Sequence, residues 1–277
     1  MDTYYVDGEF VSEDQATVSV KDLSVLRGYG VFDFLRSYNG IPFHLMDHII
    51  RLQKSARLIN MQMPYTIDDI YKLIMETIER NNHDEFNIRI ILTGGVSPSN
   101  YIPSDKPKLF IMVTALTDIP KEYYTDGVKV TTSHIERFMP GAKSINYIPA
   151  ILAMKDAADR GAVEALYVDR NGNIQEGTTS NFFAIIGNKL ITPPAERLLP
   201  GITRKVILEL AEDDFEIEIR NIHKDEVSLM DEAFITASNK EVMPVHTIDS
   251  TQLTEGVGKR SGQLMQLFNT YTANYKG

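Results

Sequence analysis

The sequence predicts an α+β protein of two domains, and three observations carry that prediction. The chain has 277 residues, enough for one large or two ordinary domains. Strand and helix patterns are mixed along it without a regular strand–helix–strand period, which favours α+β domains over a doubly wound sheet. A polar stretch at 116–127, which contains a proline, interrupts the pattern. We therefore expect an N-terminal domain at 1–118, a linker at 119–126 and a C-terminal domain at 127–277.

The first half of the chain shows the patterns of hairpins, helices and two further strands. Asp-Gly and Asn-Gly dipeptides separate β-rich runs, which predicts two hairpins. Apolar residues at helical spacing predict two helices, and a loop rich in Gly, Ser and Pro separates the last two strands. The expected elements are hairpins at 4–11 and 31–43, helices at 45–60 and 67–80, and strands at 87–92 and 109–115.

The second half alternates less regularly between strands and helices. The sequence DRNG at 169–172 predicts a turn, and Gly187-Asn188 predicts another between two β-rich runs. Leu264, Leu267 and Phe268 recur at helical spacing near the C-terminus. The expected strands are 128–133, 164–168, 182–186, 189–191, 216–220 and 233–236, and the expected helices are 145–160, 202–211 and 258–271.

Composition excludes several classes of function. Lys and Arg number 28 against 38 Asp and Glu, a formal charge of −10, which disfavours non-specific binding to nucleic acid. Without any Cys there is no disulfide, thiolate nucleophile or cysteine zinc site. No basic and apolar leader opens the sequence, and no apolar run reaches the about 18 residues of a membrane span. We expect a cytoplasmic protein with small-molecule partners, and neither a nucleic-acid nor a membrane partner.

Three motifs are incomplete and are set aside. The segment 28–33 lacks the third glycine of a dinucleotide fingerprint and precedes a strand pattern, and 256–260 lacks the spacing of a phosphate loop. His44 and His48 stand four residues apart on one predicted helix face, a spacing that can hold a metal. No third ligand has comparable spacing, so we expect no metal site.

Lys143 is the candidate for covalent chemistry. It lies among small and apolar residues in FMPGAKSINY (138–147), where we expect the entrance to a helix. A lysine in such a place can be desolvated, which leaves its amine lone pair available for a Schiff base. On local context alone, a solvated loop lysine is the favoured interpretation, because Lys is almost never fully buried unless it is paired or functional.

Three segments further along the chain supply what pyridoxal phosphate would require. Glu176 stands in a turn rich in Gly, Thr and Ser, where a carboxylate could keep a pyridinium nitrogen protonated. Gly201 opens a predicted helix, so the backbone N–H groups of Ile202 and Thr203 could bind a phosphate. A predicted strand ends in small hydroxyl residues, Ser238 among them, which could complete the phosphate site.

In this order, these motifs make the sequence similar to the class IV, or fold type IV, pyridoxal-phosphate aminotransferases. That family comprises D-amino-acid and branched-chain aminotransferases and aminodeoxychorismate lyase. The resemblance spans nearly the whole chain and implies an α+β subunit of two domains, a homodimer, and an active site between the domains. The motifs that carry it are RGYGVFD (27–33), HIIRL (48–52), KSINY (143–147), EGTTSN (176–181) and GITR (201–204).

The resemblance also implies roles for individual residues. Lys143 would hold the cofactor as a Schiff base and shuttle the proton of the substrate, and Glu176 would pair with the pyridine nitrogen. Arg51 would anchor the phosphate through its planar guanidinium. Tyr147 would approach the ring oxygen, although the branched-chain enzymes place their tyrosine one residue further from the lysine. The other implied cofactor contacts are Thr178, Ile202, Thr203 and Ser238.

The substrate carboxylate needs a cation, and the sequence departs from both known patterns. The D-amino-acid enzymes carry Arg-x-His in a loop that here has the sequence SPSNY (97–101), without charge. The branched-chain enzymes carry Tyr-x-Arg, of which Arg89 alone is kept. Arg27, Arg89 and Arg137 are the remaining candidates, and we favour Arg27, reaching across the dimer. The other expected substrate contacts are Phe32 as a pocket wall, Thr179 and Ala237.

The sequence therefore predicts a pyridoxal-phosphate transaminase. It would move an amino group between an amino acid and a 2-oxo acid such as 2-oxoglutarate or pyruvate by ping-pong half-reactions. D-amino acids and branched-chain L-amino acids are the two candidate substrate classes. The alternatives are a lyase acting on aminodeoxychorismate and, from a different class, a non-catalytic binding protein of the same fold.

Overall fold

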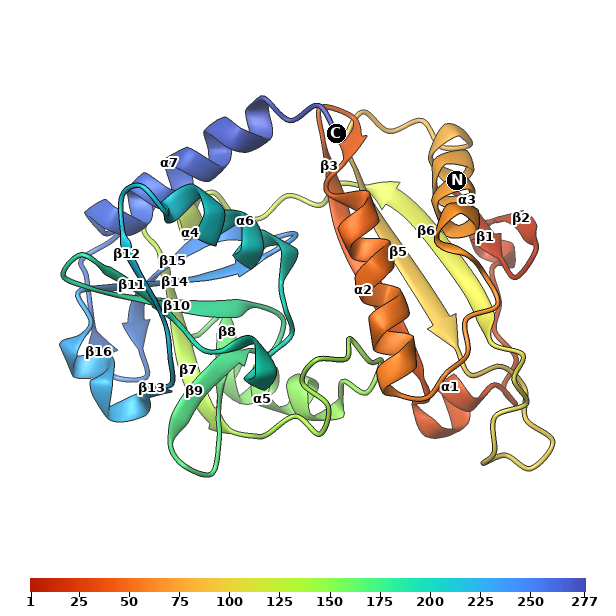
Figure 1. Cartoon of the computed structure of the whole chain (residues 1–277), viewed down its shortest axis with the longest axis horizontal. Helices are drawn as coiled ribbons and strands as arrows, with labels where there is room; N and C mark the ends of the chain where they lie inside the picture. Colours follow the sequence, from red (N-terminus) through yellow and green to blue (C-terminus); the bar gives the residue numbers. More distant parts are fainter. The chain divides into compact units, whose positions relative to one another are not determined.

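The computed structural model describes all of residues 1–277, and its contacts divide the chain into two compact units (Figure 1). Unit 1 comprises Met1–Thr117, Ala142–Asn146 and Tyr275–Gly277. Unit 2 comprises Asp118–Gly141 and Tyr147–Asn274. By contacts, the short segment that carries Lys143 therefore belongs with unit 1, although it follows the polar stretch at 116–127 in the sequence.

Unit 1 is built on a six-stranded sheet in the order β2-β1-β6-β5-β3-β4, with antiparallel pairing throughout. Its strands are β1 (Thr3–Val6), β2 (Glu9–Ser12), β3 (Gly30–Tyr38), β4 (Ile41–Pro42), β5 (Phe86–Thr93) and β6 (Lys108–Ala115). Its helices are η1 (Glu13–Gln15), α1 (Leu23–Arg27), α2 (Leu45–Leu58) and α3 (Ile67–Glu79). Both hairpins and both long helices expected here are confirmed.

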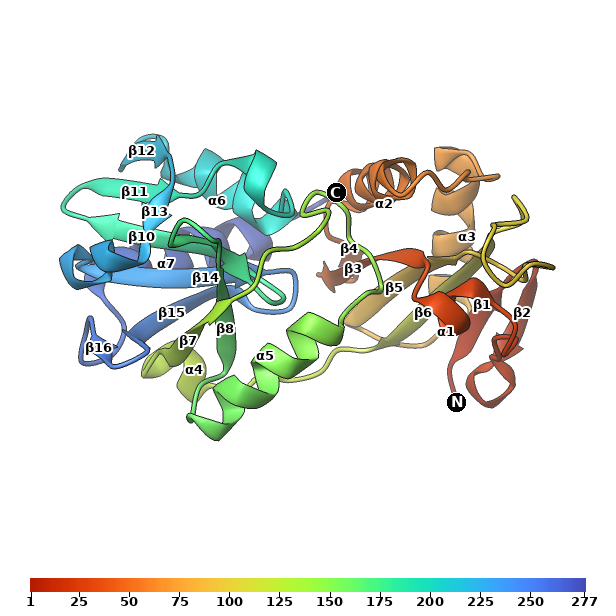
Figure 2. The same cartoon turned by 90° about the horizontal axis from the view of Figure 1, so that it is seen from below.

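The helices α2 and α3 cover one face of this sheet (Figure 2). Ile49 and Leu52 of α2 lie at helical spacing and are fully buried against the strands. α3 begins with a capping box, in which the Thr66 side chain accepts from the Asp69 backbone N–H and the Asp69 carboxylate accepts from Thr66 N–H. An apolar stripe and a defined start thus set the position of these helices.

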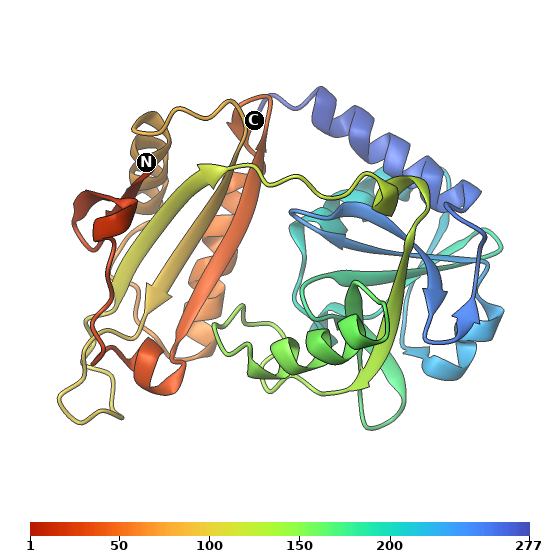
Figure 3. The ribbon, with the colours of Figure 1, turned by 180° about the vertical axis from the view of Figure 1, so that it is seen from behind.

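The other face of the unit 1 sheet carries the side chains that alternate with those of the core. In β3, Val31 and Leu35 belong to the core under the helices. Because successive side chains of a strand point to opposite faces, Phe32 and Phe34 point away from that core. Figure 3 shows this face of β3, β5 and β6.

Unit 2 is built on a larger mixed sheet in the order β12-β11-β10-β14-β15-β7-β8-β9-β13, with β16 beside β15. Its strands are β7 (Val128–His134), β8 (Glu164–Val168), β9 (Asn173–Gly177), β10 (Asn181–Ile186), β11 (Lys189–Thr192), β12 (Glu216–Ile219), β13 (Ile222–His223), β14 (Glu232–Ala237), β15 (Glu241–Ile248) and β16 (Thr251–Gln252). Its helices are α4 (Glu122–Thr125), α5 (Ile148–Asp159), η2 (Ala195–Arg197), α6 (Ile202–Ala211), η3 (Lys224–Leu229) and α7 (Lys259–Ala273).

One additional pairing makes the unit 2 sheet turn back on itself. β9 pairs with β8 and also with β10, where Glu176 lies opposite Asn181. α5 packs on β7 and β8, whereas α6 and α7 pack against β14, and α7 also reaches β15. The pairing of β9 with β10 brings Glu176 to the start of β10, which is where the resemblance places the cofactor residues.

The structure corrects the expected helix at 145–160, which begins only at Ile148. Ile145 instead lies outside any helix, and its backbone N–H donates a hydrogen bond to the Gly30 carbonyl of β3. Pro149 stands in the first turn of α5, where a proline needs no hydrogen-bond donor. Lys143 therefore lies beside a strand and not at the entrance to a helix.

One further local expectation is wrong. Glu176 does not stand in a turn but near the end of strand β9. The polar stretch at 116–127 contains the short helix α4, and its role as a linker stays a prediction. The sequence patterns also leave β15 unpredicted, because Pro244 cannot donate to a sheet and a proline usually marks an edge. Here Pro244 lies opposite Phe234 in an interior strand.

No helix of this chain combines the length and the apolar composition that are needed to cross a lipid bilayer.

Candidate active site

Lys143 lies in a segment without regular secondary structure, hydrogen-bonded to β3 and α2, within unit 1. Its backbone carbonyl accepts a hydrogen bond from Phe32 N–H at 2.9 Å, and Ile145 N–H donates to Gly30 at 3.1 Å. The backbone N–H of Lys143 donates to the hydroxyl of Ser55, a buried residue of α2, at 3.1 Å. These bonds fix the lysine backbone to a strand on one side and to a helix on the other.

The Lys143 side chain lies beside the Phe32 ring. Its Nζ is 4.8 Å from the centre of that ring. The guanidinium of Arg89, on β5, is 5.5 Å from the centre of the same ring and 5.1 Å from that of Phe34. Aromatic faces attract cations at these distances. An amine and a guanidinium therefore share one aromatic wall.

Arg51 forms a buried ion pair on the helix-covered face. Its Nε donates to Asp33 Oδ2 at 2.9 Å and its Nη2 donates to Asp33 Oδ1 at 2.7 Å, a bidentate arrangement. His48 Nδ1 is also 2.7 Å from Asp33 Oδ1. Asp33 and His48 thereby set the plane and position of the Arg51 guanidinium.

The charges in this buried cluster follow from its neighbours. Burial alone would raise the pKa of Asp33, but Arg51 and His48 outweigh it and hold that pKa far below its ordinary value. Burial lowers the pKa of His48 to about 4, against the opposing effect of Asp33. His48 is therefore neutral at pH 7, so its Nδ1 donates to Asp33, while its Nε2 has no hydrogen-bond partner.

The two histidines noted in the sequence have separate environments. His48 is completely buried and hydrogen-bonded to Asp33, whereas His44 lies 3.4 Å from the Asp47 carboxylate at the start of α2. No group of three His, Cys, Asp or Glu side chains is arranged to hold a metal ion.

Glu176 is a buried carboxylate of unit 2, with both oxygens engaged. Oε1 accepts from Arg137 Nη1 at 2.7 Å, and Oε2 accepts from the backbone N–H of Leu199 at 3.0 Å. Only 4 % of the Glu176 surface is exposed. Arg137, one of the cations considered for the substrate carboxylate, is thus an ion-pair partner of Glu176.

The N-terminus of α6 lies beside Glu176 because Leu199 connects the two. The Asn181 side-chain amide donates to the Leu199 carbonyl at 2.9 Å. Gly201, the N-cap of α6, packs so closely on Asn181 that a Cβ at this position would overlap its side-chain oxygen. Ile202 and Thr203 form the first turn of α6, so their N–H groups lie at the positive end of that helix.

The hydroxyl groups of Thr178 and Thr179 face a buried carboxylate. Both donate to Glu164, Thr179 at 2.9 Å. Ala237 and Ser238 lie at the end of β14, which pairs with β10 beside this turn. The expected cofactor and substrate residues of unit 2 therefore gather where β9 and β14 end and where β10 and α6 begin.

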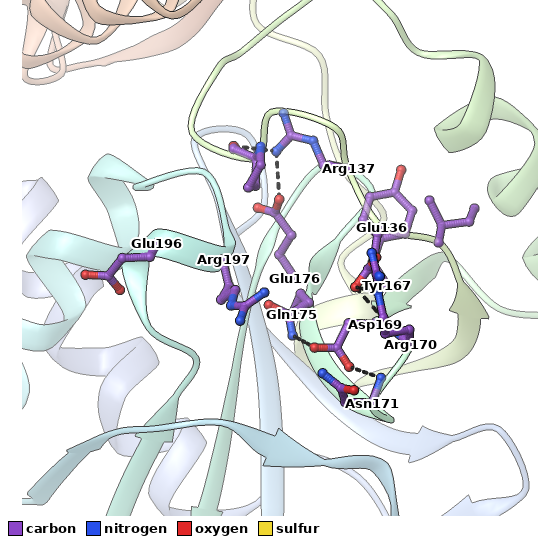
Figure 4. A pocket seen from close by; sticks show the side chains of 12 residues that line it. Glu136, Arg137, Tyr167, Asp169, Arg170, Asn171, Gln175, Glu176, Glu196 and Arg197 are labelled. Carbon is purple, nitrogen blue, oxygen red and sulfur yellow. Dashed lines mark hydrogen bonds and ion pairs between the residues drawn. The ribbon is translucent and has the colours of Figure 1, made fainter.

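A cavity of about 240 Å³ lies on the Arg137 side of Glu176 (Figure 4). Figure 4 shows Arg137 and Glu176 pointing toward one another at its wall, with Gln175 and Asp169 hydrogen-bonded nearby. The other lining residues are Ile135, Glu136, Pro140, Tyr167, Arg170, Asn171, Glu196 and Arg197. Burial raises the pKa of Tyr167, so its phenol is neutral at pH 7.

For Arg27 and Tyr147, the structure shows contacts other than those expected from the resemblance. The guanidinium of Arg27 lies over the ring of Tyr101 at 4.6 Å and donates to the Leu26 carbonyl. Tyr147 is the N-cap residue of α5. Their expected roles in binding carboxylate and cofactor stay predictions.

Sequence reasoning missed several residues that support the site. These residues are Asp33, Ser55, Glu164 and Lys240. The signal available for two of them is a single acid inside an apolar strand run: Asp33 in VFDFL and Glu164 in EALYV. Such an acid is rarely buried without a partner.

Curated relatives that match this chain include branched-chain-amino-acid aminotransferases and D-alanine aminotransferases. Residues 30–248 match the family described as Amino-transferase class IV. A putative branched-chain-amino-acid aminotransferase of Methanocaldococcus jannaschii is 34% identical over 274 residues, which covers 95% of this chain and 94% of that protein. A D-alanine aminotransferase of Staphylococcus epidermidis is 32% identical over 281 residues, with 99% of each chain covered.

Solved structures match over the whole length. The branched-chain amino acid aminotransferase of Escherichia coli superposes with a TM-score of 0.93 at 25% identity, covering 100% of this chain and 96% of that one. A second branched-chain amino acid aminotransferase, solved with pyridoxamine 5'-phosphate, gives a TM-score of 0.92 at 26% identity, covering 99% and 95%.

The chain belongs to the class IV aminotransferase family. Its two-sheet α+β architecture is that of the branched-chain aminotransferase structures, fold type IV, and the family uses pyridoxal phosphate. The expected fold and enzyme class are confirmed. D-alanine and branched-chain relatives match at similar identity, so the substrate is a separate question.

Proposed function

We propose that this class IV aminotransferase binds pyridoxal 5'-phosphate and transfers an amino group between an amino acid and a 2-oxo acid such as 2-oxoglutarate or pyruvate. The amino acid is a D-amino acid or a branched-chain amino acid. The observation that carries the proposal is Lys143, whose backbone is bonded to β3 and α2 while its amine lies over the Phe32 ring. One of the related branched-chain enzymes was solved with pyridoxamine 5'-phosphate.

The side chains present fit the chemistry of this cofactor. Lys143 offers a primary amine beside an apolar ring, and Glu176 offers a buried carboxylate whose charge is balanced by Arg137. Arg51 and the first turn of α6 offer a guanidinium and backbone N–H groups, the two donor types that bind phosphate best. Each of these donors is held in place by neighbours in its own unit.

Pyridoxal phosphate supplies, when bound, an aldehyde for an amine and a ring that withdraws electrons from the substrate. Lys143 provides that amine and moves the proton at the substrate Cα, because hydrogen bonds of its backbone segment to β3 and α2 fix its position. Glu176 would hold a proton at the ring nitrogen, and Arg137 balances the charge of the Glu176 carboxylate by direct pairing. The Phe32 ring limits access of water to the Lys143 amine.

Arg89 is the cation whose position best supports a role with the substrate carboxylate. It shares the Phe32 ring with the Lys143 amine, so a carboxylate bound to it would lie near the reacting atom. Arg27 contacts Tyr101 instead and stays the alternative. A buried carboxylate needs such a partner, because desolvation of an unpaired charge is costly.

A half-reaction screen tests the proposal. The cofactor-loaded protein is mixed separately with D- and L-amino acids, and the visible absorbance of the cofactor is followed. We expect loss of the absorbance of the lysine-bound cofactor, together with formation of the matching 2-oxo acid, for one stereochemical series only. Release of pyruvate from aminodeoxychorismate over many turnovers, with no 2-oxo acid present to accept an amino group, would contradict transamination and point to lyase chemistry.

We also propose that the chain acts in the cytoplasm as a homodimer. α5 carries an exposed apolar face formed by Ile148, Ile151 and Leu152, of the kind that a second subunit covers. Sedimentation equilibrium at micromolar concentration tests the assembly. A monomer of 31.3 kDa at all concentrations would contradict the dimer.

A further inference from the structure

The buried carboxylate of Glu164 accepts hydrogen bonds from several residues of unit 2. Glu164 lies at the start of β8 and its surface is 0% exposed. Its own pKa would be raised by this burial, but Lys240 and the neighbouring hydroxyls outweigh burial and lower it. Glu164 is therefore an ionised carboxylate in the interior.

The partners of Glu164 come mainly from the turn at 177–181, between β9 and β10. Oε1 accepts from the backbone N–H of Thr178 at 3.1 Å and also from its hydroxyl. Oε2 accepts from the hydroxyl groups of Thr179 at 2.9 Å and Ser180 at 3.1 Å. Three successive side chains of the turn are thus oriented toward one carboxylate.

Lys240, from a second segment of the chain, also binds the Glu164 carboxylate. Its Nζ is 2.5 Å from Glu164 Oε2 and 2.6 Å from the Thr179 hydroxyl, and its side chain is only 14% exposed. Lys240 belongs to the bend between β14 and β15, two residues beyond Ser238. The ion pair therefore ties the bend that carries Ala237 and Ser238 to the turn that carries Thr178 and Thr179.

We propose that Lys240, acting through Glu164, is a positioning residue for transamination: the pair fixes the 177–181 turn and the 237–241 bend against each other. This rests on the proposed function, because that function assigns cofactor and substrate contacts to these two segments. Lys240 itself touches no reacting atom. Together, Lys240 and Glu164 hydrogen-bond to the side-chain hydroxyl groups of the turn. The backbone of the turn then stays available to contact cofactor and substrate.

The physical basis is that removing one residue of a buried ion pair costs more free energy than removing both. Removal of one partner leaves the other charge buried without compensation, whereas removal of both charges can cost little. In Glu164→Gln, the new amide group would face the Lys240 ammonium, donor against donor. In the double variant, the amide can donate to the hydroxyls of Thr179 and Ser180, which are able to accept.

The experiment compares Lys240→Met, Glu164→Gln and the double variant with the parent protein. We expect each single variant to lower kcat/KM about tenfold and the double variant to recover to within about threefold, as coupled residues do. Hydrogen exchange of amides 177–181 is measured on the cofactor-free protein. We expect faster exchange in the single variants and near-parental exchange in the double variant.

Lys189→Met is the matched control. Lys189 forms an ion pair with Glu218 at the surface of the same unit, and neither residue contacts the turn. It should change neither kcat/KM nor exchange at 177–181. If Lys240→Met also leaves both quantities unchanged, the positioning role is overturned, and the same holds if the double variant is worse than either single variant.

The two readouts separate this inference from the proposed function. If the protein does not transaminate but the exchange pattern holds, the assigned activity fails while the coupling of the two segments stands. If Glu164→Gln does not fold, Lys240→Met decides the question through exchange and kcat/KM together. If Lys240→Met keeps the parental kcat/KM and the parental exchange at 177–181, the proposal is wrong.

Discussion

Lys143 and Phe32 contact each other twice, once through the backbone and once through the side chains. The Phe32 N–H donates to the Lys143 carbonyl at 2.9 Å, and the Lys143 Nζ lies 4.8 Å from the centre of the Phe32 ring. The backbone bond fixes where the lysine leaves the chain, and the ring limits where its amine can lie. The position of the Lys143 amine is thereby set by hydrogen bonds of its backbone segment to a strand.

Replacement of Lys143 by alanine should abolish both the covalent attachment of the cofactor and turnover. The physical reason is that alanine leaves this place beside Phe32 without an amine. Borohydride reduction followed by mass spectrometry measures the attachment, and stopped-flow absorbance measures the half-reaction. Lys72→Ala on the exposed face of α3 is the control and should keep both. Attachment that persists in the Lys143 variant would refute the assignment.

Stability should fall as the pH drops from 6.5 toward 4, because of His48. Its folded pKa is about 4, against an ordinary value of 6.5. In that window the unfolded chain binds a proton that the folded chain does not, so the free energy of unfolding decreases as the pH falls. A shift of this size corresponds to about 3 kcal/mol in total.

Urea unfolding at pH values from 4 to 8 measures this effect, with His48→Gln as the comparison. The variant should lose the part of the pH dependence that lies between 6.5 and 4. NMR titration of the His48 ring in the parent protein gives an independent reading. A ring that titrates near pH 6.5 in the folded state would disprove the explanation.

Arg89→Ala should raise the KM for both the amino acid and the 2-oxo acid by about tenfold or more, the loss expected for one charged hydrogen bond. Because both substrates carry a carboxylate, both constants should rise together. Arg27→Ala provides the direct comparison, since Arg27 contacts Tyr101 and not Phe32. If the Arg27 variant shows the increase and the Arg89 variant does not, the assignment of the two arginines is reversed.

Arg137→Met should weaken the site through Glu176. The carboxylate of Glu176 would keep the Leu199 N–H but lose its ion pair with Arg137. We expect a loss of about 1–2 kcal/mol in the free energy of unfolding, toward the low end for a charged hydrogen bond because Arg137 is partly exposed. Thermal denaturation of the cofactor-free protein measures it.

Arg170→Met is the control for this change, in the wall of the same cavity. Arg170 pairs with Glu136 at the surface and is 80% exposed, so solvent screens the pair. Its replacement should change stability much less than that of Arg137. If Arg137→Met and Arg170→Met lower the free energy of unfolding equally, the ion pair of Arg137 with Glu176 stabilises the fold no more than a surface pair does.

Sequence patterns locate most elements because their causes are local. The hairpin around Asn39-Gly40 follows from turn residues, and α3 follows from apolar spacing and a capping box. The expected start of α5 is wrong because the competing interaction is distant in sequence. Residues 143–145 bond to β3, which lies far earlier in the chain, and that pairing outweighs helix formation.

The sequence by itself determined the order of the motifs around Lys143, Glu176 and Gly201, and through them the family and its chemistry. Only the tertiary structure decided which charges meet: Arg51 with Asp33, Arg137 with Glu176, and Lys240 with Glu164. The reason is physical. A motif is a run of neighbours along the chain, whereas the partner of a buried charge is whichever residue the sheets and helices bring within hydrogen-bond distance.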